Sequence, residues 1–341
     1  MAALAAIPPH HRLHRLLVPA SYLGCCAGFV DQAAARPKLA TPRRTIMTEP
    51  VGIIGTGAMG SRFARRLAAL GHPVHAWNRT QARVEALRGT GIVPESTPRA
   101  VAEQSELLVC MVWDSAALRT VAQGSDGFLA GLTPRHVVAD ASTVEPEVSA
   151  EIAAIVGDTG AAMLDTPVSG SLDAAESGRL MIMASGNKSA FDRARPVLDA
   201  LARSVQHVNE VNGSALALKL AINLQVAIQE VAWGEGLALA GAFGIDRAQA
   251  TRVMLDSVIA SPMLHYRAPF VLDPPDEVWA SAAQLLKDVS YAVDRSEGRA
   301  VVGRRARDLL AGICTSGRAD REAAELIIAA ADGEQQDGAA R

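Results

Sequence analysis

Residues 51–60, VGIIGTGAMG, carry the strongest fold signal in the 341-residue chain. Their first five residues form a short apolar run typical of a strand, and apolar side chains at helical spacing follow over 59–70. A G-x-G-x-x-G turn joins the two, and it lets a backbone approach a pyrophosphate whose charge the helix N-terminus favours. We therefore expect a dinucleotide site here, with a glycine-rich turn that binds nothing as the alternative. The expected site comprises Gly55, Thr56, Gly57, Ala58, Met59 and Gly60.

A second apolar stretch, residues 73–77, ends in Asn78-Arg79-Thr80. A site specific for NAD usually has Asp or Glu at this point, where the acid bonds the ribose 2′-hydroxyl and repels a 2′-phosphate. Asn78 removes the repulsion, Arg79 offers a forked cation, and Thr80 offers a hydroxyl donor. The segment predicts NADP(H) in preference to NAD(H). The alternative is that Arg79 is an ordinary surface arginine.

Strand and helix patterns alternate to about residue 210. This alternation predicts an α/β N-terminal Rossmann domain with a doubly wound, mostly parallel sheet. The rest of the chain reads as helical, beginning with one long apolar helix over 214–240. We expect an all-α C-terminal domain linked to the first by that helix. The other expected helices lie near 247–257, 280–297, 300–313 and 319–331.

The expected organisation has four segments: an extension 1–46, an NADP-binding Rossmann domain 47–210, an all-helical substrate and dimerisation domain 211–335, and a disordered tail 336–341. The extension carries six basic residues and one acid, and its apolar runs are too short for a membrane span. We expect it to be disordered. A mis-called start, with Met47 as the true first residue, an organelle-targeting segment and a functional tail stay open as its origin. The first expectation for the location is the cytoplasm.

The composition excludes several classes of protein. Apolar residues make up 49% of the chain, enough for a large core, and a net charge of −3 argues against a general nucleic-acid binder. The four cysteines form no CxxC pair and no Cys/His pair at metal-ligand spacing. We therefore expect no disulfide scaffold, no metal site, no nucleic-acid partner and no membrane partner.

Lysine is scarce: only four of the 33 basic residues are Lys, at positions 38, 188, 219 and 287. Arginine keeps its proton in proteins, whereas lysine can lose it, so these positions are candidates for a titratable amine. Lys219 and Asn223 are four residues apart and share one face of the long apolar helix. Burial would lower the pKa of Lys219 towards ~7–8, which suits acid–base work at neutral pH. The alternative is a surface lysine.

Two further segments follow apolar strand patterns: DAST, residues 140–143, and DTPVSGS, residues 165–171. Together with GIIGTGAMG, WNRT, GSDGFLAGL, NGSALALKLAIN and LLKD, their order resembles the β-hydroxyacid dehydrogenase family over about residues 49–332. That family includes 3-hydroxyisobutyrate dehydrogenases, tartronate semialdehyde reductases and glyoxylate/succinic semialdehyde reductases, and its fold is similar to that of 6-phosphogluconate dehydrogenase. WNRT and the final Ser of VSGS look most like the NADPH-dependent semialdehyde reductases.

The resemblance implies catalytic roles for Lys219 and Asn223 and a binding role for Lys287. Lys219 becomes the general acid/base, which protonates the carbonyl oxygen during reduction and accepts the alcohol proton during oxidation. Asn223 positions the reacting oxygen or the lysine, unless it only bonds a neighbouring carbonyl. Lys287, followed by Asp288, matches a late Lys-Asp pair near cofactor and substrate, unless it is a plain surface charge.

The resemblance also implies a carboxylate site, in which Ser142, Ser169 and Gly170 hold the substrate through hydroxyl and backbone donors. Ser142, which also lies at the cofactor, has a second interpretation as a helix cap. Ser169 and Gly170 have one as a simple turn after Pro167. Asp165 is expected to be structural.

This sequence departs from the family pattern around the substrate. Where members usually have Leu-Pro-Asp after the third apolar strand, it has Val112-Trp113-Asp114. Met111, Val112 and Trp113 are expected at the cofactor, with Trp113 beside the nicotinamide, where its ring would reshape the pocket. Glu235 in the long helix is expected to make a buried helix–helix contact.

The first hypothesis for the function is an NADPH-dependent oxidoreductase that exchanges a hydride with a short β-hydroxyacid or semialdehyde. The substrate candidates are glyoxylate, succinic semialdehyde, tartronate semialdehyde and 3-hydroxyisobutyrate. One alternative is an imine reductase, which shares the fold but typically carries Asp or Tyr at the lysine position. Another is a non-catalytic cofactor-binding scaffold. The long helix, apolar on most sides, needs cover from a second subunit, so we expect a homodimer or a tetramer.

Overall fold

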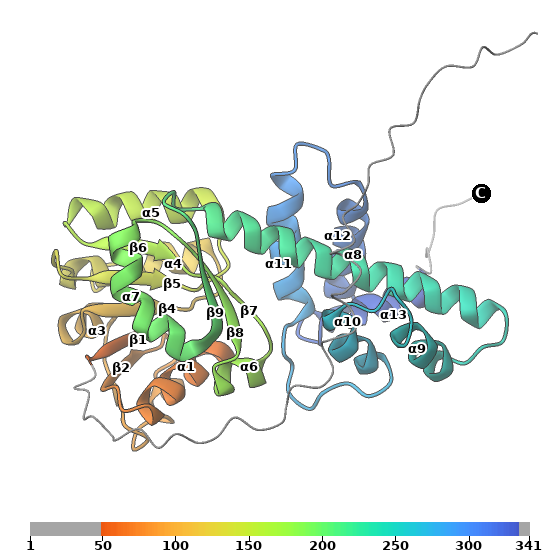
Figure 1. Cartoon of the computed structure of the whole chain (residues 1–341), viewed down its shortest axis with the longest axis horizontal. Helices are drawn as coiled ribbons and strands as arrows, with labels where there is room; N and C mark the ends of the chain where they lie inside the picture. Colours follow the sequence, from red (N-terminus) through yellow and green to blue (C-terminus); the bar gives the residue numbers. More distant parts are fainter. Residues whose placement is uncertain (1–48, 334–341) are drawn as a thin grey trace, which may run out of the picture. The chain divides into compact units, whose positions relative to one another are not determined.

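The central feature of the protein is a nine-stranded sheet with the order β3-β2-β1-β4-β5-β6-β8-β7, in which β9 also pairs with β8 (Figure 1). The computed structural model describes residues 49–333, so the predictions for 1–46 and for 336–341 lie outside the described residues. The first six strands pair in parallel, and β8 runs antiparallel to β6 and β7. The strands are β1 (Val51–Ile54), β2 (Val74–Trp77), β3 (Ile92–Pro94), β4 (Leu107–Cys110), β5 (Val137–Asp140), β6 (Ala162–Asp165), β7 (Val168–Ser169), β8 (Leu180–Ser185) and β9 (Ala202–Asn209).

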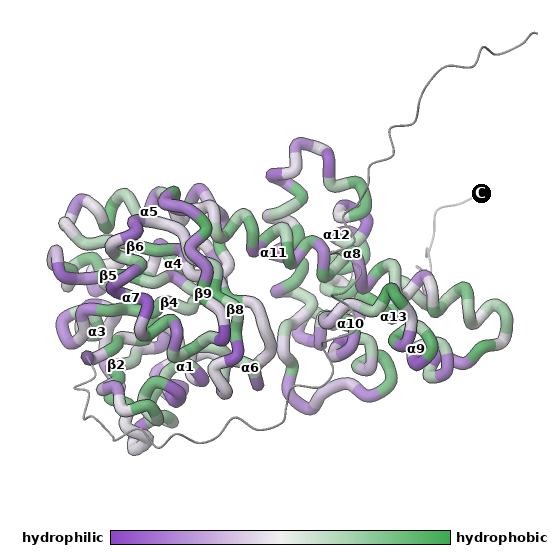
Figure 2. The backbone as a smooth tube through the Cα atoms, viewed as in Figure 1, coloured by the Kyte–Doolittle hydropathy of each residue, from purple (hydrophilic) through white to green (hydrophobic). Residues whose placement is uncertain are grey.

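Helices cover both faces of this sheet, as the doubly wound fold requires. The core on one face includes residues of α1, α6 and α7, and the core on the other includes residues of α3, α4 and α5. Along these helices green and purple alternate in Figure 2, because one side is apolar and the other polar. The helices are α1 (Ala58–Ala69), α2 (Gln81–Glu85), α3 (Pro98–Gln104), α4 (Ser115–Gln123), α5 (Pro146–Asp158), α6 (Leu172–Ser177) and α7 (Lys188–Leu201), with a 3₁₀ turn over Phe128–Gly131.

The second half is helical, and α8 (Ser214–Ala242) runs from the sheet into it (Figure 1). This helix packs mainly against α13 and α11, and it also contacts β6 and β8. The sheet part and the helical part belong to one compact unit. The remaining helices are α9 (Arg247–Leu255), α10 (Pro262–Arg267), α11 (Ala282–Asp294), α12 (Val301–Ile313) and α13 (Glu325–Asp332), with a 3₁₀ turn over Ala268–Val271 and a π-turn over Cys314–Arg318.

The predicted fold class is confirmed, and the differences concern short elements. The elements that were not predicted are β3, β7, α3, α4, α6 and α10, because each has nine residues or fewer and is too short for a hydrophobic pattern to repeat clearly. The helix expected over 319–331 begins only at Glu325, because the carbonyl oxygens of Ala319 and Arg321 accept hydrogen bonds from the N–H groups of Ala283 and Ala282 at the start of α11. The expectation for Glu235 was wrong: it is exposed, and Glu230 is the fully buried glutamate of α8.

Among residues 49–333, α8 is the one helix long and apolar enough to cross a membrane by length and composition. One third of its most apolar window is buried inside the structure. Core helices of folded domains pass the same test, so this feature is weak evidence for a membrane span.

The start of α8 is fixed by the buried carboxylate of Asp165 at the end of β6. One oxygen accepts hydrogen bonds from Ser149 Oγ (2.5 Å) and Asn212 Nδ2 (3.4 Å). The other accepts from Ser185 Oγ (2.6 Å) and from the backbone N–H of Gly213. Asp165 therefore joins two strands and α5 to the two residues before α8, as expected of a structural residue.

We predict that Asp165→Ala lowers the free energy of unfolding by about 3–5 kcal/mol, since it leaves several buried donors without an acceptor. Urea unfolding followed by circular dichroism measures the change. Asp158→Ala is the matched control, because Asp158 is an exposed carboxylate. An equal, small loss for both variants would contradict the structural role of Asp165.

Candidate active site

The glycine turn between β1 and α1 has two tightly packed glycines and one open glycine. A Cβ on Gly55, whose φ is +98°, would collide with the carbonyl oxygen of Met111, and a Cβ on Gly60 would collide with that of Gly55. Gly57 faces open space, with no atom within 4 Å of a Cβ, and it caps α1 without a side-chain hydrogen bond. The open space in front of free helix N–H groups fits the pyrophosphate of a dinucleotide.

The end of β2 combines one structural side chain with exposed polar ones. Asn78 accepts a hydrogen bond from the backbone N–H of Thr56 and donates one to the carbonyl oxygen of Thr80, both at 3.1 Å. Asn78 thus holds the glycine turn against β2, a role that the sequence did not indicate. Arg79 and Thr80 are exposed, and Arg79 forms no hydrogen bond or ion pair with any residue in 49–333. Arg83, in the first turn of α2, adds an exposed cation that lies outside the predicted site.

The loop after β4 is tied to the loop after β5. The backbone N–H of Val112 donates to Ser142 Oγ at 2.9 Å, and the N–H of Ser142 donates to the Asp140 carboxylate at 3.1 Å. Ser142 is fully buried, and α5 begins after Glu145, so the interpretation of Ser142 as a helix cap was wrong. Trp113 projects from the same loop with half of its surface exposed (52%).

Lys219 lies on α8 as a partly buried amine without a hydrogen bond or ion pair to any residue in 49–333. Its pKa is lowered to about 8, first because burial disfavours the ammonium. The charge of Asp288 opposes this shift, and the charges of Arg267 and Lys287 add to it. An unpaired amine that titrates near neutral pH has the properties required of a general acid/base.

Asp288 on α11 gathers the polar residues beside Lys219. One of its oxygens accepts from Asn223 Nδ2 at 2.6 Å, and the other pairs with Lys287 Nζ at 2.7 Å. Lys287 Nζ also donates to the carbonyl oxygen of Thr143 at 2.6 Å. The interpretations of Asn223 as bonding a carbonyl and of Lys287 as a plain surface charge were therefore wrong. These bonds hold α8, α11 and the loop after β5 together.

The segment with Ser169 and Gly170 lies at β7, on an edge of the sheet. Ser169 pairs with Met181 in the ladder, and Gly170 has φ +143° with Leu180 close to its Cβ position. No hydrogen bond or ion pair within residues 49–333 joins Ser169 to the group around Lys219. The role of Ser169 and Gly170 in substrate binding stays a prediction.

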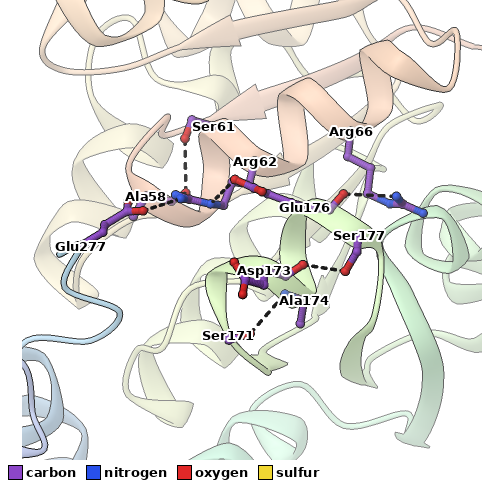
Figure 3. Close-up of polar contacts among 10 residues, drawn as sticks. All are labelled: Ala58, Ser61, Arg62, Arg66, Ser171, Asp173, Ala174, Glu176, Ser177 and Glu277. Carbon is purple, nitrogen blue, oxygen red and sulfur yellow. Dashed lines mark hydrogen bonds and ion pairs between the residues drawn. The ribbon is translucent and has the colours of Figure 1, made fainter. Parts of the chain in front are cut away.

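Arg62 on α1 connects the sheet part to the helical part, a role that no motif indicated. Its guanidinium pairs with Glu176 of α6 at 2.9 Å and with Glu277, in the segment before α11, at 2.7 Å (Figure 3). A second connection joins Arg295, the residue after α11, to Glu145 at 2.9 Å. Both connections keep the helical residues of the site beside the glycine turn and the β5 loop.

Comparison with known families gives two adjoining matches. The NAD binding domain of 6-phosphogluconate dehydrogenase matches residues 50–209, and the NAD-binding domain of NADP-dependent 3-hydroxyisobutyrate dehydrogenase matches residues 213–329. Glyoxylate/succinic semialdehyde reductase 2 of Arabidopsis thaliana is 30% identical over 247 residues, which are 72% of this chain and 69% of that protein.

Solved structures agree with these matches. A 3-hydroxyisobutyrate dehydrogenase from Salmonella typhimurium has TM-score 0.75 and 26% identity, over 82% of this chain and 99% of that one. Psf3 in complex with NADP+ and 2-OPP has TM-score 0.76 and 26% identity, over the same shares. An imine reductase from Myxococcus stipitatus has TM-score 0.58 and 20% identity, over 81% of this chain and 98% of that one, which shows a common fold alone.

Proposed function

The chain belongs to the β-hydroxyacid dehydrogenase family, and we propose that it exchanges a hydride between NADP(H) and a short carboxylated aldehyde or the matching hydroxyacid. As a member it is an NAD(P)-dependent oxidoreductase. The observation that carries the proposal is the unpaired amine of Lys219, whose pKa of about 8 lies near neutral pH. Glyoxylate, succinic semialdehyde, tartronate semialdehyde and 3-hydroxyisobutyrate are the candidate substrates.

Lys219 is the proposed general acid/base. A bound nicotinamide supplies or accepts the hydride. During reduction the Lys219 ammonium donates a proton to the carbonyl oxygen, and during oxidation the neutral amine accepts the alcohol proton. Asn223 orients the reacting oxygen while its other contact, Asp288, keeps it in place.

The carboxylate of the substrate is proposed to lie against Ser142, Ser169 and Gly170, with Lys287 nearby. Ser142 Oγ accepts the N–H of Val112, and its side chain also bonds the buried Asp140 carboxylate, which keeps the loop after β5 in place at the proposed carboxylate site. Lys287 is supported by its bond to the carbonyl oxygen of Thr143, one residue from Ser142. Its ammonium adds a positive charge that favours an anionic substrate.

NADP(H) is the proposed cofactor in preference to NAD(H). Met111, Val112 and Trp113 are proposed to contact the nicotinamide side, and Gly55–Gly60 the pyrophosphate. At the ribose, the absence of an acid at Asn78 and the exposure of Arg79 and Thr80 favour a 2′-phosphate.

An imine reductase remains a second candidate because the half-exposed Trp113 offers a large apolar surface beside the proposed nicotinamide position. Lys219 argues against it, since a titratable amine beside Lys287 and Asn223 suits a hydroxyl or carbonyl oxygen. Turnover of NADPH with a panel of short aldehydes, keto acids and cyclic imines decides between them. Exclusive turnover of imines would overturn the proposal.

We predict that the pH dependence of reduction and of oxidation follows the protonation state of Lys219. Reduction needs the ammonium, so its kcat/KM falls as pH rises through about 8; oxidation needs the neutral amine, so its kcat/KM rises over the same range. Lys219→Met lowers kcat/KM by about 10²–10⁴-fold, the usual contribution of a general acid or base. Binding of NADPH stays intact.

Lys188→Met is the matched control, because Lys188 is an exposed lysine paired with Asp192. It leaves the rate and the pH profile unchanged. Undiminished turnover by Lys219→Met would refute the assignment of the acid/base.

We predict that Arg79→Glu weakens NADPH binding by about 10- to 100-fold, or about 1.4–2.8 kcal/mol, because the new carboxylate repels the 2′-phosphate. NADH binding changes little. Fluorescence titration with both cofactors measures this, with Arg203→Glu as the control at an exposed arginine of β9. Equal NADPH affinity in all three proteins would contradict the proposed preference.

We further propose a homodimer that covers the apolar end of α8 and the neighbouring α9. Side chains of this end are widely exposed, and Phe243 is 80% exposed. Burying a side chain of this size stabilises an interface by about 1.5–3 kcal/mol. The other exposed apolar residues of this end are Leu239, Ile245, Val253, Val258 and Ile259.

Phe243→Asp is expected to shift the protein to a monomer in light scattering while its circular dichroism spectrum stays unchanged, because the exposed side chain is not part of the fold of one chain. Val301→Asp, at an exposed valine that begins α12, is the control and leaves the mass unchanged. A monomeric wild-type protein would refute the dimer.

A further inference from the structure

Arg62 lies where three segments around the proposed dinucleotide site meet. Its Nη1 donates to the carbonyl oxygen of Ala58, the first residue of α1, at 2.9 Å. Its Nε donates to Glu176 of α6 at 2.9 Å, and its Nη2 donates to Glu277 at 2.7 Å (Figure 3). The Arg62 side chain is 12% exposed, whereas both carboxylates are more than half exposed. Of these three contacts, only the one with Glu277 reaches the helical part of the protein.

Glu277 belongs to the loop over residues 272–281, here called the strap, which leads into α11. The two ends of the strap are held together: the Trp279 ring packs edge-on against Phe270, with ring centroids 5.0 Å apart. The backbone N–H of Trp279 also donates to Glu322 Oε2 at 2.7 Å. Short surface loops whose ends lie close together, called Ω-loops, are frequently functional.

Between its ends the strap has a single polar attachment. Within residues 49–333, the ion pair of Glu277 with Arg62 is the only hydrogen bond or ion pair formed by residues 274–278. Pro274 and Pro275 fix their φ angles near about −65°, which stiffens this part of the loop. The strap is therefore anchored at its base and held near its tip by one pair of charges.

The ion pair at the tip is weak enough to break repeatedly. Ion pairs with an exposed partner contribute little to stability, and salt screens them. A loop held by such a contact opens and closes readily, because little free energy is lost on opening. Loops that close over a bound ligand and open to release it are common in enzymes, and their opening often limits turnover.

We propose that the ion pair between Glu277 and Arg62 is a latch: it holds the strap beside the start of α1, and it has to break before the dinucleotide enters or leaves. The carbonyl oxygen of Ala58 and the Glu277 carboxylate bond the same guanidinium, so the strap lies within one side chain of the turn that faces the pyrophosphate. This inference rests on the proposed dinucleotide site. It concerns exchange of the cofactor and is independent of the proton transfer at Lys219.

A latch and a direct effect of the Glu277 charge on the cofactor predict opposite changes. A carboxylate beside a pyrophosphate repels it, so removal of the charge alone would slow the release of the cofactor. As part of a latch, the same carboxylate keeps the strap closed, so its removal speeds release. Entry is faster as well, because a closed strap obstructs both directions. The dissociation constant then changes little.

The test uses Glu277→Gln, which keeps the size of the side chain and removes its charge. Glu176→Gln is the matched control, because Glu176 pairs with the same guanidinium and is equally exposed, 57% against 56%, but belongs to the sheet part. Stopped-flow fluorescence of NADPH, chased from its complex by excess NADP+, measures the rate of release. Binding traces at several NADPH concentrations measure the rate of entry, and melting temperatures confirm that both variants fold.

We expect Glu277→Gln to raise both rates by about three- to fivefold, where fivefold corresponds to about 1 kcal/mol. The dissociation constant stays within about twofold of the wild-type value, because the two rates change together. Glu176→Gln leaves both rates unchanged. In about 1 M NaCl the difference between Glu277→Gln and the wild-type protein disappears, since the ion pair is then screened.

Release that is unchanged or slower in Glu277→Gln overturns the latch, and so does an equal acceleration in Glu176→Gln. These rates are measured without a substrate, so full turnover by Lys219→Met would refute the proposed acid/base and leave the latch intact. A wild-type protein that binds neither NADPH nor NADH would refute the dinucleotide site and the latch together. Equal release rates in proteins that do bind NADPH refute the latch alone.

Discussion

The hydrogen bonds to Asp165 determine where the sheet ends and where α8 begins. Its carboxylate accepts donors from α5, from β8 and from the two residues before α8, and Gly213 meets it with φ +94°. Because a helix is rigid over one or two turns, fixing its first residue also fixes Lys219, five residues after Ser214. The direction of the amine is thus decided by a carboxylate that takes no part in the chemistry.

Buried charge is used twice on the helical side, with different results. The Asp288 carboxylate bonds both Asn223 and Lys287 and so holds these two side chains beside each other. At Arg267 one cation lies between two carboxylates, and burial raises the pKa of Glu230 to about 7. Buried ion pairs add little net stability on average, so such arrangements are better explained by what they position.

Short sequence patterns correctly predicted those features of the structure that depend on neighbouring residues alone. The glycine turn, the flanking strand and helix, and the apolar α8 follow from short-range periodicity, and Lys219 was recognisable because lysine is rare in this chain. The sequence did not indicate which side of α8 is buried, since apolar residues lie on almost every side of it. Glu235 was therefore expected to be buried, and Glu230 was overlooked. Contacts between distant residues, such as Arg62 with Glu277 or Ser142 with Val112, depend on how whole elements pack and leave no mark in either segment.

The three glycines after β1 differ in what constrains them. Gly55 and Gly60 pack against backbone carbonyl oxygens of the protein itself, whereas Gly57 faces open space. In evolutionary terms, a descendant that abandoned its nucleotide would still need the outer two to fold, but selection on the middle one would relax. A related protein that has lost glycine at position 57 alone would then be one that keeps the fold but no longer binds the dinucleotide.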